Sequence, residues 1–144
     1  MNKIFFYLFI LLFSFYHSSN ASDELNFIGK WKFEKIVKVA YSLTNEEKML
    51  DIYGKSDIEI SDKDVVFCGE KIADVNYKIV KTPTSDRDPR FNNNYDSYQY
   101  GYGKDRKYIV FFRVFSKKEL EVELEYFENS LIYCDDGYLI YFKK

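Results

Sequence analysis

Histidine is almost missing from this sequence. His17 is the only one among 144 residues, and it lies in an N-terminal segment that we expect to be removed. A chain without histidine lacks the commonest general base of enzymes and the commonest zinc ligand. We therefore expect a protein that is not an enzyme and that has no cofactor and no metal site.

The motifs of the common catalytic sites are missing as well. The sequence contains no Gly-x-Ser-x-Gly nucleophile elbow, P-loop, zinc signature or glycine-rich dinucleotide-binding turn. Pairs of carboxylates do occur, at Asp62/Asp64, Asp86/Asp88 and Asp135/Asp136. Each pair lies in a predicted turn, where aspartate is favoured because its side chain bonds to the local main chain.

An excess of basic residues is also absent. Lys and Arg number 21 against 23 Asp and Glu, which gives a formal net charge of −2 at pH 7. Proteins that bind nucleic acid carry a concentrated basic face. We therefore expect no nucleic-acid partner, although a basic protein partner remains compatible with this charge.

The sequence also lacks a hydrophobic run long enough to span a membrane. The apolar run "IFFYLFILLFSFY" covers only residues 4–16, whereas a spanning helix needs about 20 residues. Lys3 precedes the run, and the small residues Ser19 and Ala21 follow it. This order is typical of a secretory signal peptide; the alternative is an uncleaved anchor.

We accordingly expect residues 1–21 to be a signal peptide and residues 22–144 to form a single domain without a stable membrane span. The protein is then exported, to the periplasm or the medium. In an oxidising compartment an even number of cysteines predicts a disulfide, so Cys68 and Cys134 are expected to pair. The alternative is two buried free thiols.

Alternation of apolar and polar residues predicts strands through most of the domain. In the first strand Trp31, Phe33, Val37 and Val39 share one face. The clearest alternation, "LEVELEY", directs Leu120, Val122, Leu124 and Tyr126 inward and Glu121, Glu123 and Glu125 outward.

One helix is predicted, over about residues 45–53. Thr44 and Glu47 form a capping-box pattern at its start, and Gly54 can end it. Met49, Ile52 and Tyr53 follow helical spacing and predict the packed side.

These elements predict a mainly β fold: an antiparallel up-and-down barrel of about eight strands, with one short helix after the first strand. The connections are mostly short, so neighbouring strands form a meander. Closing a meander into a barrel removes its exposed edges.

The segment Gly29-Lys30-Trp31 resembles the Gly-x-Trp motif that opens the first strand of lipocalins and fatty-acid-binding proteins. With "VVFCG" at residues 65–69 and a late Asp-Gly turn, the chain also resembles small exported lipocalin-like bacterial proteins. The resemblance implies that Trp31 closes one end of a barrel against a basic side chain, Arg113 or Lys143. The helix after the first strand is nearer to the fatty-acid-binding order, and a Thr-Asp-Tyr turn is not found.

Aromatic residues are abundant, with 14 Tyr and 14 Phe, and tyrosine suits recognition surfaces because it joins a flat apolar ring to a polar tip. The long loop 81–94 holds both prolines and leads into a tyrosine-rich stretch. Its candidates for contacting a ligand or a partner are Tyr95, Tyr98, Tyr100 and Tyr102. The alternative is that these rings pack over the barrel mouth or pair across strands.

Two functions remain open. The first is binding of a small apolar or aromatic ligand inside the barrel. The second is binding of another exported protein, as an inhibitor or immunity protein does, through the 82–103 excursion. An empty apolar pocket favours the first and a packed interior favours the second; a purely structural envelope protein is a third possibility.

Overall fold

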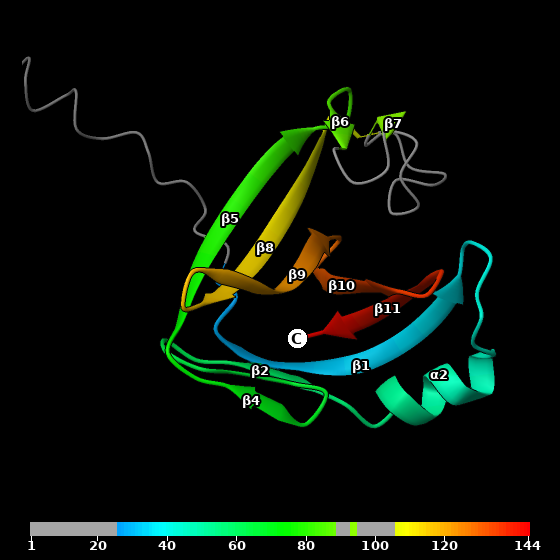
Figure 1. Cartoon of the computed structure of the whole chain (residues 1–144), viewed down its shortest axis with the longest axis horizontal. Helices are drawn as coiled ribbons and strands as arrows, with labels where there is room; N and C mark the ends of the chain where they lie inside the picture. The colour runs from blue at the N-terminus through cyan, green and yellow to red at the C-terminus, as the bar shows by residue number, and fades with distance from the viewer. Residues whose placement is uncertain (1–25, 89–92, 95–105) are drawn as a thin grey trace, which may run out of the picture.

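The computed structural model describes residues 26–88, 93–94 and 106–144 (Figure 1). The expected signal peptide lies outside the described residues, as do the four candidate tyrosines, Tyr95, Tyr98, Tyr100 and Tyr102. Within the described ranges, no helix combines the length and the apolar character that crossing a membrane requires.

The fold is mainly β, with an antiparallel sheet of nine strands and one short helix, α2 (Glu46–Tyr53), which follows the first strand. A further short pair consists of β6 (Arg87–Asp88) and β7 (Asn93–Asn94). The main sheet contains β1 (Gly29–Lys38), β2 (Ile58–Ile60), β3 (Val65–Phe67), β4 (Glu70–Ile72), β5 (Val75–Pro83), β8 (Tyr108–Ser116), β9 (Glu119–Phe127), β10 (Ser130–Asp135) and β11 (Tyr138–Lys143).

The sheet is open, so the predicted closed barrel is not confirmed. Its strand order is β4-β3-β2-β1-β11-β10-β9-β8-β5. β4 and β5 follow one another in the chain, yet they form the two opposite edges and do not pair. Figure 1 shows β5 and β8 rising together away from the strands around β1.

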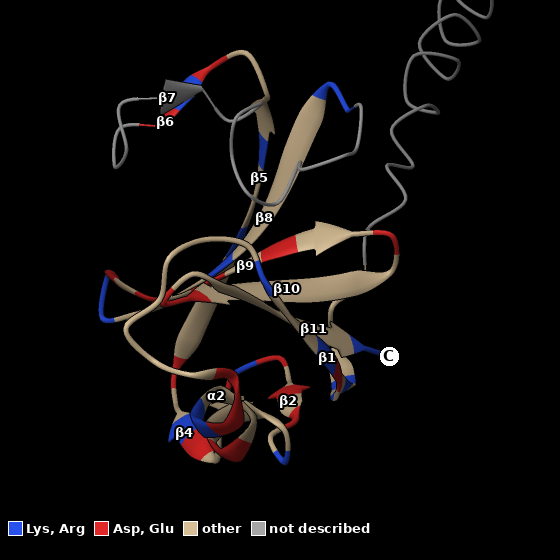
Figure 2. Ribbon diagram, turned by 90° about the vertical axis from the view of Figure 1, so that its right-hand side faces the viewer, with Lys and Arg blue, Asp and Glu red and all other residues tan. Residues whose placement is uncertain are grey.

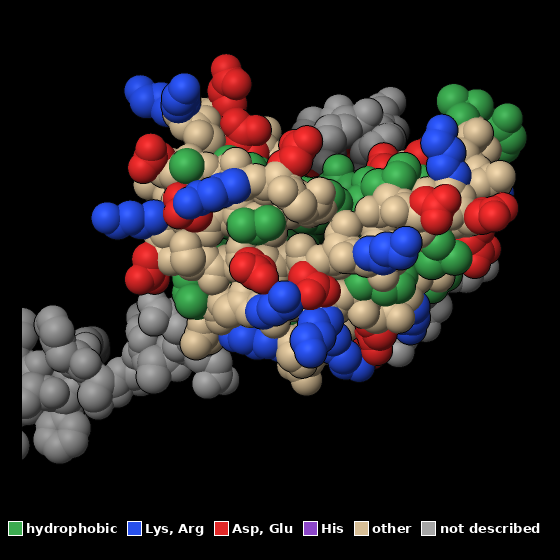
Figure 3. Space-filling view, turned by 90° about the horizontal axis from the view of Figure 1, so that it is seen from below, with side chains coloured by type: hydrophobic (Ala, Val, Ile, Leu, Met, Phe, Trp, Pro, Cys, Tyr) green, Lys and Arg blue, Asp and Glu red, His purple; other side chains and the backbone are tan. Residues whose placement is uncertain are grey.

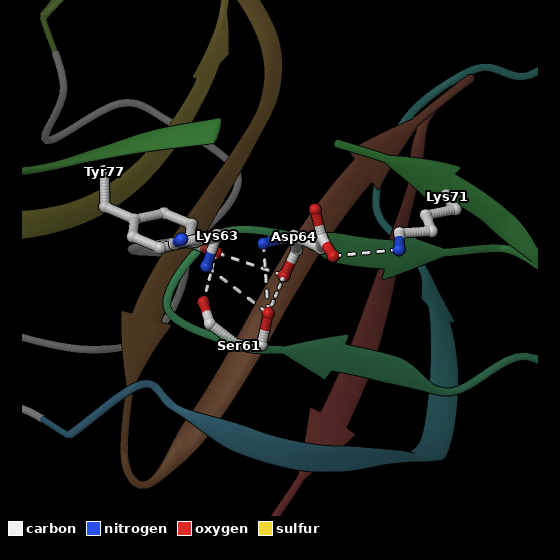
Figure 4. A network of polar contacts seen from close by, with 5 residues as sticks. All are labelled: Ser61, Lys63, Asp64, Lys71 and Tyr77. Carbon is white, nitrogen blue, oxygen red and sulfur yellow. Dashed lines mark hydrogen bonds and ion pairs between the residues drawn. The ribbon is translucent and has the colours of Figure 1, made fainter. Parts of the chain in front are cut away.

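The start of β5 contacts the turn that joins β2 to β3. The main-chain N–H of Val75 donates to the carbonyl oxygen of Lys63, at 2.8 Å. The hydroxyl of Tyr77 donates to the carbonyl oxygens of Ser61, at 2.6 Å, and Asp64, at 3.2 Å (Figure 4). These bonds join β5 to the β2–β3 turn, and β5 forms no ladder with the other edge strand, β4.

One cluster of buried apolar side chains joins the helix to strands from the whole sheet. A second, small cluster, Ile109 and Phe111 with Val80 packed against them, is separate. The main cluster contains Phe27, Trp31, Met49, Tyr53, Ile58, Ile60, Val65, Val75, Phe112, Val114, Val122, Leu124, Leu131, Tyr138, Ile140 and Phe142. Because successive strand residues face opposite sides, the neighbours Phe111 and Phe112 place the two clusters on opposite faces.

A β-bulge changes which residues of β1 face the core. The register between β1 and β11 shifts between Phe33 and Lys35. Ile36 consequently packs against the main cluster, whereas Val37 is 38% exposed. The prediction that Val37 shares the inner face with Trp31 and Phe33 is wrong, since a bulge adds one residue and reverses the alternation beyond it.

The helix begins one residue later than its capping pattern predicts. The side chain of Asn45, not Thr44, accepts the N–H of Lys48 at 2.9 Å. Thr44 is held elsewhere, because its N–H donates to Asp136 Oδ2 at 2.8 Å. Gly54 does end the helix, as its N–H donates to the Leu50 oxygen at 2.8 Å.

The packed side of α2 is narrower than its pattern predicts. Met49 and Tyr53 are buried, but Ile52 is exposed. β9 deviates similarly: Val122 and Leu124 are buried as predicted, whereas Leu120 is exposed near the start of the strand.

Candidate functional site

A pocket of about 200 Å³ lies where the chain enters β1, β9 ends and the last residue follows β11. We call it the Trp31 pocket. Its lining residues are Asn26, Phe27, Trp31, Tyr126, Asn129 and Lys144.

Aromatic rings form the apolar wall of the Trp31 pocket. Phe27 and Trp31 stack with ring centroids 6.5 Å apart, and Tyr126 meets both edge-on, at 5.4 Å from Phe27 and 6.5 Å from Trp31. The indole N–H of Trp31 donates to the carbonyl oxygen of Phe27 at 2.9 Å. The indole is thereby fixed, since its polar atom is satisfied inside the protein.

Polar groups form the remaining wall. Lys144 Nζ lies 5.5 Å from the centroid of the Trp31 ring and donates to the Asn26 oxygen at 2.8 Å. An ammonium group over an aromatic face is attracted by the ring electrons, and it has three donors in all. The Tyr126 hydroxyl donates to Asn129 Oδ1 at 3.0 Å.

Gly29 permits the approach of Lys144. Its φ of +129° belongs to a region that residues with a Cβ rarely adopt, and a Cβ at this position would stand 3.0 Å from Lys144 Cε. Glycine is favoured where the backbone is approached closely. The Gly-x-Trp spacing thus places the bare backbone of Gly29 and the ring of Trp31 beside the same lysine.

The cation over Trp31 is Lys144, which corrects the expectation of Arg113 or Lys143. Arg113 Nε donates to Glu123 Oε2 at 2.6 Å, and Lys143 Nζ pairs with Glu34 Oε1 at 3.0 Å. Strand alternation gives the reason. Arg113 lies between the core residues Phe112 and Val114, and Lys143 follows Phe142, so both face the other side of the sheet.

Cys68 and Cys134 are half-buried, and the expected disulfide between them is not formed in this structure. Cys68 packs against the main cluster, as does Tyr133, whose ring lies 4.8 Å from that of Phe67. Because Cys134 follows Tyr133 along β10, its side chain is directed to the other face. Burial raises the pKa of the Cys68 thiol to about 11.

A shallower groove of about 480 Å³ runs along the outer side of β1 to β4. Both of its lysines are paired, Lys30 with Asp57 and Glu59 at 3.0 Å each, and Lys71 with Asp64 at 2.8 Å. Exposed pairs of this kind contribute little to stability, and their mutual pairing leaves the groove without an unpaired lysine for a ligand.

Charges of both signs occur side by side on the surface of the described residues. The underside of the view in Figure 1 carries Lys and Arg interspersed with Asp and Glu (Figure 3). Charged residues are dense around α2, whereas β8, β10 and β11 are largely uncharged (Figure 2). The polar groups of the Trp31 pocket come from the residues that line it.

Metal-binding geometry is not found among the described residues, where no group of three or more His, Cys, Asp or Glu side chains could hold an ion. Comparisons of the chain with protein-family models, curated proteins and solved structures give no significant match.

Proposed function

We propose that this chain is an exported, lipocalin-like binding protein without enzymatic activity, and that it holds a small aromatic or apolar ligand in the Trp31 pocket. One observation carries the proposal: three aromatic rings and one ammonium group converge on a single pocket. The rings accept a flat apolar body. The ammonium of Lys144 favours an acidic group on that ligand.

The volume of the pocket limits the ligand. About 200 Å³ equals the volume of roughly seven water molecules in the liquid, and it is below the range of pockets that hold drug-sized molecules. A single aromatic ring with a short acidic substituent fits these limits.

A ligand wholly enclosed by the sheet is less well supported. Sixteen buried apolar side chains from α2, the segment before β1 and strands throughout the sheet form one continuous cluster, and eight or nine strands leave room for side chains or for one small ligand. We therefore place the ligand at the end of the sheet, beside Trp31, instead of inside it.

The experiment uses the fluorescence of Trp31, the only tryptophan in the chain. Benzoate should change its emission in a saturable way, and benzyl alcohol, of similar size but uncharged, should bind more weakly. Lys144→Met should remove the preference for benzoate. Lys143→Met is the matched control, because Lys143 pairs with Glu34 away from the pocket. Equal benzoate binding by the wild type and K144M would refute the assigned role of the ammonium group.

The same packed core supports the alternative function, a module that binds another exported protein through residues 82–103. One experiment distinguishes the two functions. Replacing Tyr95, Tyr98, Tyr100 and Tyr102 by Ser should leave benzoate binding unchanged if the Trp31 pocket is the functional site. If the protein is a partner-binding module, the same variant loses its partner and the wild type binds no benzoate.

A further inference from the structure

A buried ion pair lies on the face of the sheet opposite the main cluster. Arg106 precedes β8, and Glu125 lies near the end of β9. The side chain of Arg106 is 9% exposed and that of Glu125 is 0% exposed. Charged groups are almost never buried to this degree without a specific set of partners.

Apolar and aromatic residues surround Glu125. Across the ladder it is paired with Phe111 of β8 and with Ile132 of β10, and Ile132 is paired in turn with Tyr141 of β11. The Arg106 guanidinium lies 4.5 Å from the centre of the Phe127 ring. The pair therefore lies in a site from which water is largely excluded.

The hydrogen bonding of the pair is incomplete. Arg106 Nη1 donates to Glu125 Oε1. Three further atoms of the pair are buried without a hydrogen-bond partner in the structure: Arg106 Nε, Arg106 Nη2 and Glu125 Oε2. Buried polar atoms are nearly always satisfied, and an exception calls for an explanation such as a bound ion or water.

The two free donors lie on one edge of the guanidinium. Nε–H and one N–H of Nη2 point the same way, which is the fork that binds both oxygens of a carboxylate. We propose that this edge of Arg106 is a binding site for a small carboxylate ion. Arg113 differs, because its Nε is already used by Glu123 and its side chain is more exposed.

Binding at this edge is coupled to a proton. A carboxylate ion adds a second negative charge beside Glu125, and uptake of one proton by Glu125 restores the balance. Burial raises the pKa of Glu125 to about 7, against the opposing effect of Arg106. The protonated acid also converts Oε2 into a possible donor.

The Arg113–Glu123 ion pair lies on the same face, two residues along β8 and β9 from Phe111 and Glu125. β8 and β10 present the apolar residues Phe111 and Ile132 to Glu125. β11 presents Tyr141, whose pKa is raised by burial, and β1 presents Lys35, whose Nζ lies 4.8 Å from the Tyr141 ring. Glu34 and Glu128 act on Tyr141 from further out. Among the described carboxyl groups, Glu125 is the one whose pKa is raised towards neutral pH.

The test uses sodium acetate as the probe, against sodium chloride at equal ionic strength. The Nε–H resonance of Arg106 in a ¹H–¹⁵N spectrum, identified by its loss in Arg106→Lys, should shift with acetate in a saturable way at pH 6. The apparent affinity should fall as the pH rises to 8, approaching tenfold per unit above pH 7. An unchanged resonance would overturn the proposal and indicate buried water alone.

Two variants keep the test informative if Arg106→Lys folds poorly. Glu125→Gln should retain acetate binding and lose its pH dependence between pH 6 and 8, because glutamine carries no titrating proton. Arg113→Lys, the matched control, should bind acetate as the wild type does. Equal pH dependence in the wild type and E125Q, or loss of binding in R113K, would overturn the assignment.

Discussion

The hydroxyl of Tyr77, on the edge strand β5, donates a 2.6 Å hydrogen bond to the main-chain oxygen of Ser61, in the turn that joins β2 to β3. This contact joins the edge strand β5 to the β2–β3 turn (Figure 4). Burial, together with the nearby negative charges of Asp64 and Asp62, raises the pKa of Tyr77 to about 12. The hydroxyl therefore keeps its proton, and its role as donor, over the whole physiological pH range.

Tyr77→Phe should lower the free energy of unfolding by about 1 kcal/mol, because it removes one hydrogen bond and leaves two carbonyl oxygens without this donor. Urea denaturation measures the change. Tyr108→Phe is the control: Tyr108 is exposed, so its loss should be within the error of the experiment. Equal stability of Y77F and the wild type would mean that the main-chain bond from Val75 to Lys63 alone holds β5 to the β2–β3 turn.

Wild-type stability should fall as the pH rises from about 4.5 to 7, because of Glu125. Its folded pKa, about 7, lies above its ordinary value of 4.5, so the folded protein holds an extra proton in this interval and loses it as the pH rises. The total is at most about 3 kcal/mol. Urea midpoints of the wild type and Glu125→Gln across this range should differ in slope; parallel curves would contradict the raised pKa.

Gly29→Ala should cost more stability than Gly69→Ala. Both glycines have positive φ, at +129° and +81°, so both variants strain the backbone by about 1–3 kcal/mol. Only at position 29 would the new methyl group also approach Lys144, at 3.0 Å, while nothing lies within 4 Å of a Cβ at position 69. Comparing the melting temperatures of G29A and G69A separates the cost of backbone strain from the cost of the contact with Lys144. A larger loss in G69A would argue against close packing of Lys144 on β1.

Reduction should leave the melting temperature unchanged, because no disulfide joins Cys68 and Cys134. Thiol titration of the unfolded, unreduced protein should find two thiols per chain. In the folded protein Cys68 should react slowly with iodoacetamide at pH 8, since burial holds the pKa of its thiol near 11. A fall of several degrees on reduction would instead show that the two cysteines are joined.

The elements of this fold follow from local patterns, and the errors arise where a longer-range contact overrides the pattern. The alternation in β9 predicts the burial of Val122 and Leu124, since a half-buried strand needs only one apolar face. It misplaces Val37, because a bulge is not visible in the order of apolar and polar residues. It misplaces the N-cap as well, since Thr44 is bound by Asp136, 92 residues away.

Part of the Trp31 pocket can be predicted from the sequence. Gly29 and Trp31 stand out as a motif, and both lie at the site. Lys144 is not predicted from the sequence. Strand alternation does argue against Arg113 and Lys143, because their neighbours Phe112, Val114 and Phe142 have the pattern of core residues. The predicted barrel is not confirmed for a different reason: the same strands build an open or a closed sheet, and the outcome depends on whether the edge strands β4 and β5 pair.

The position of β1 between β2 and β11 has a consequence for how the chain is made. The strand emerges early from the ribosome, but its partner on one side is the last strand to appear. Pairing between such distant segments is slow, and until it happens β1 presents one unpaired edge. We therefore expect β1 to complete its pairing only after β11 has been synthesised.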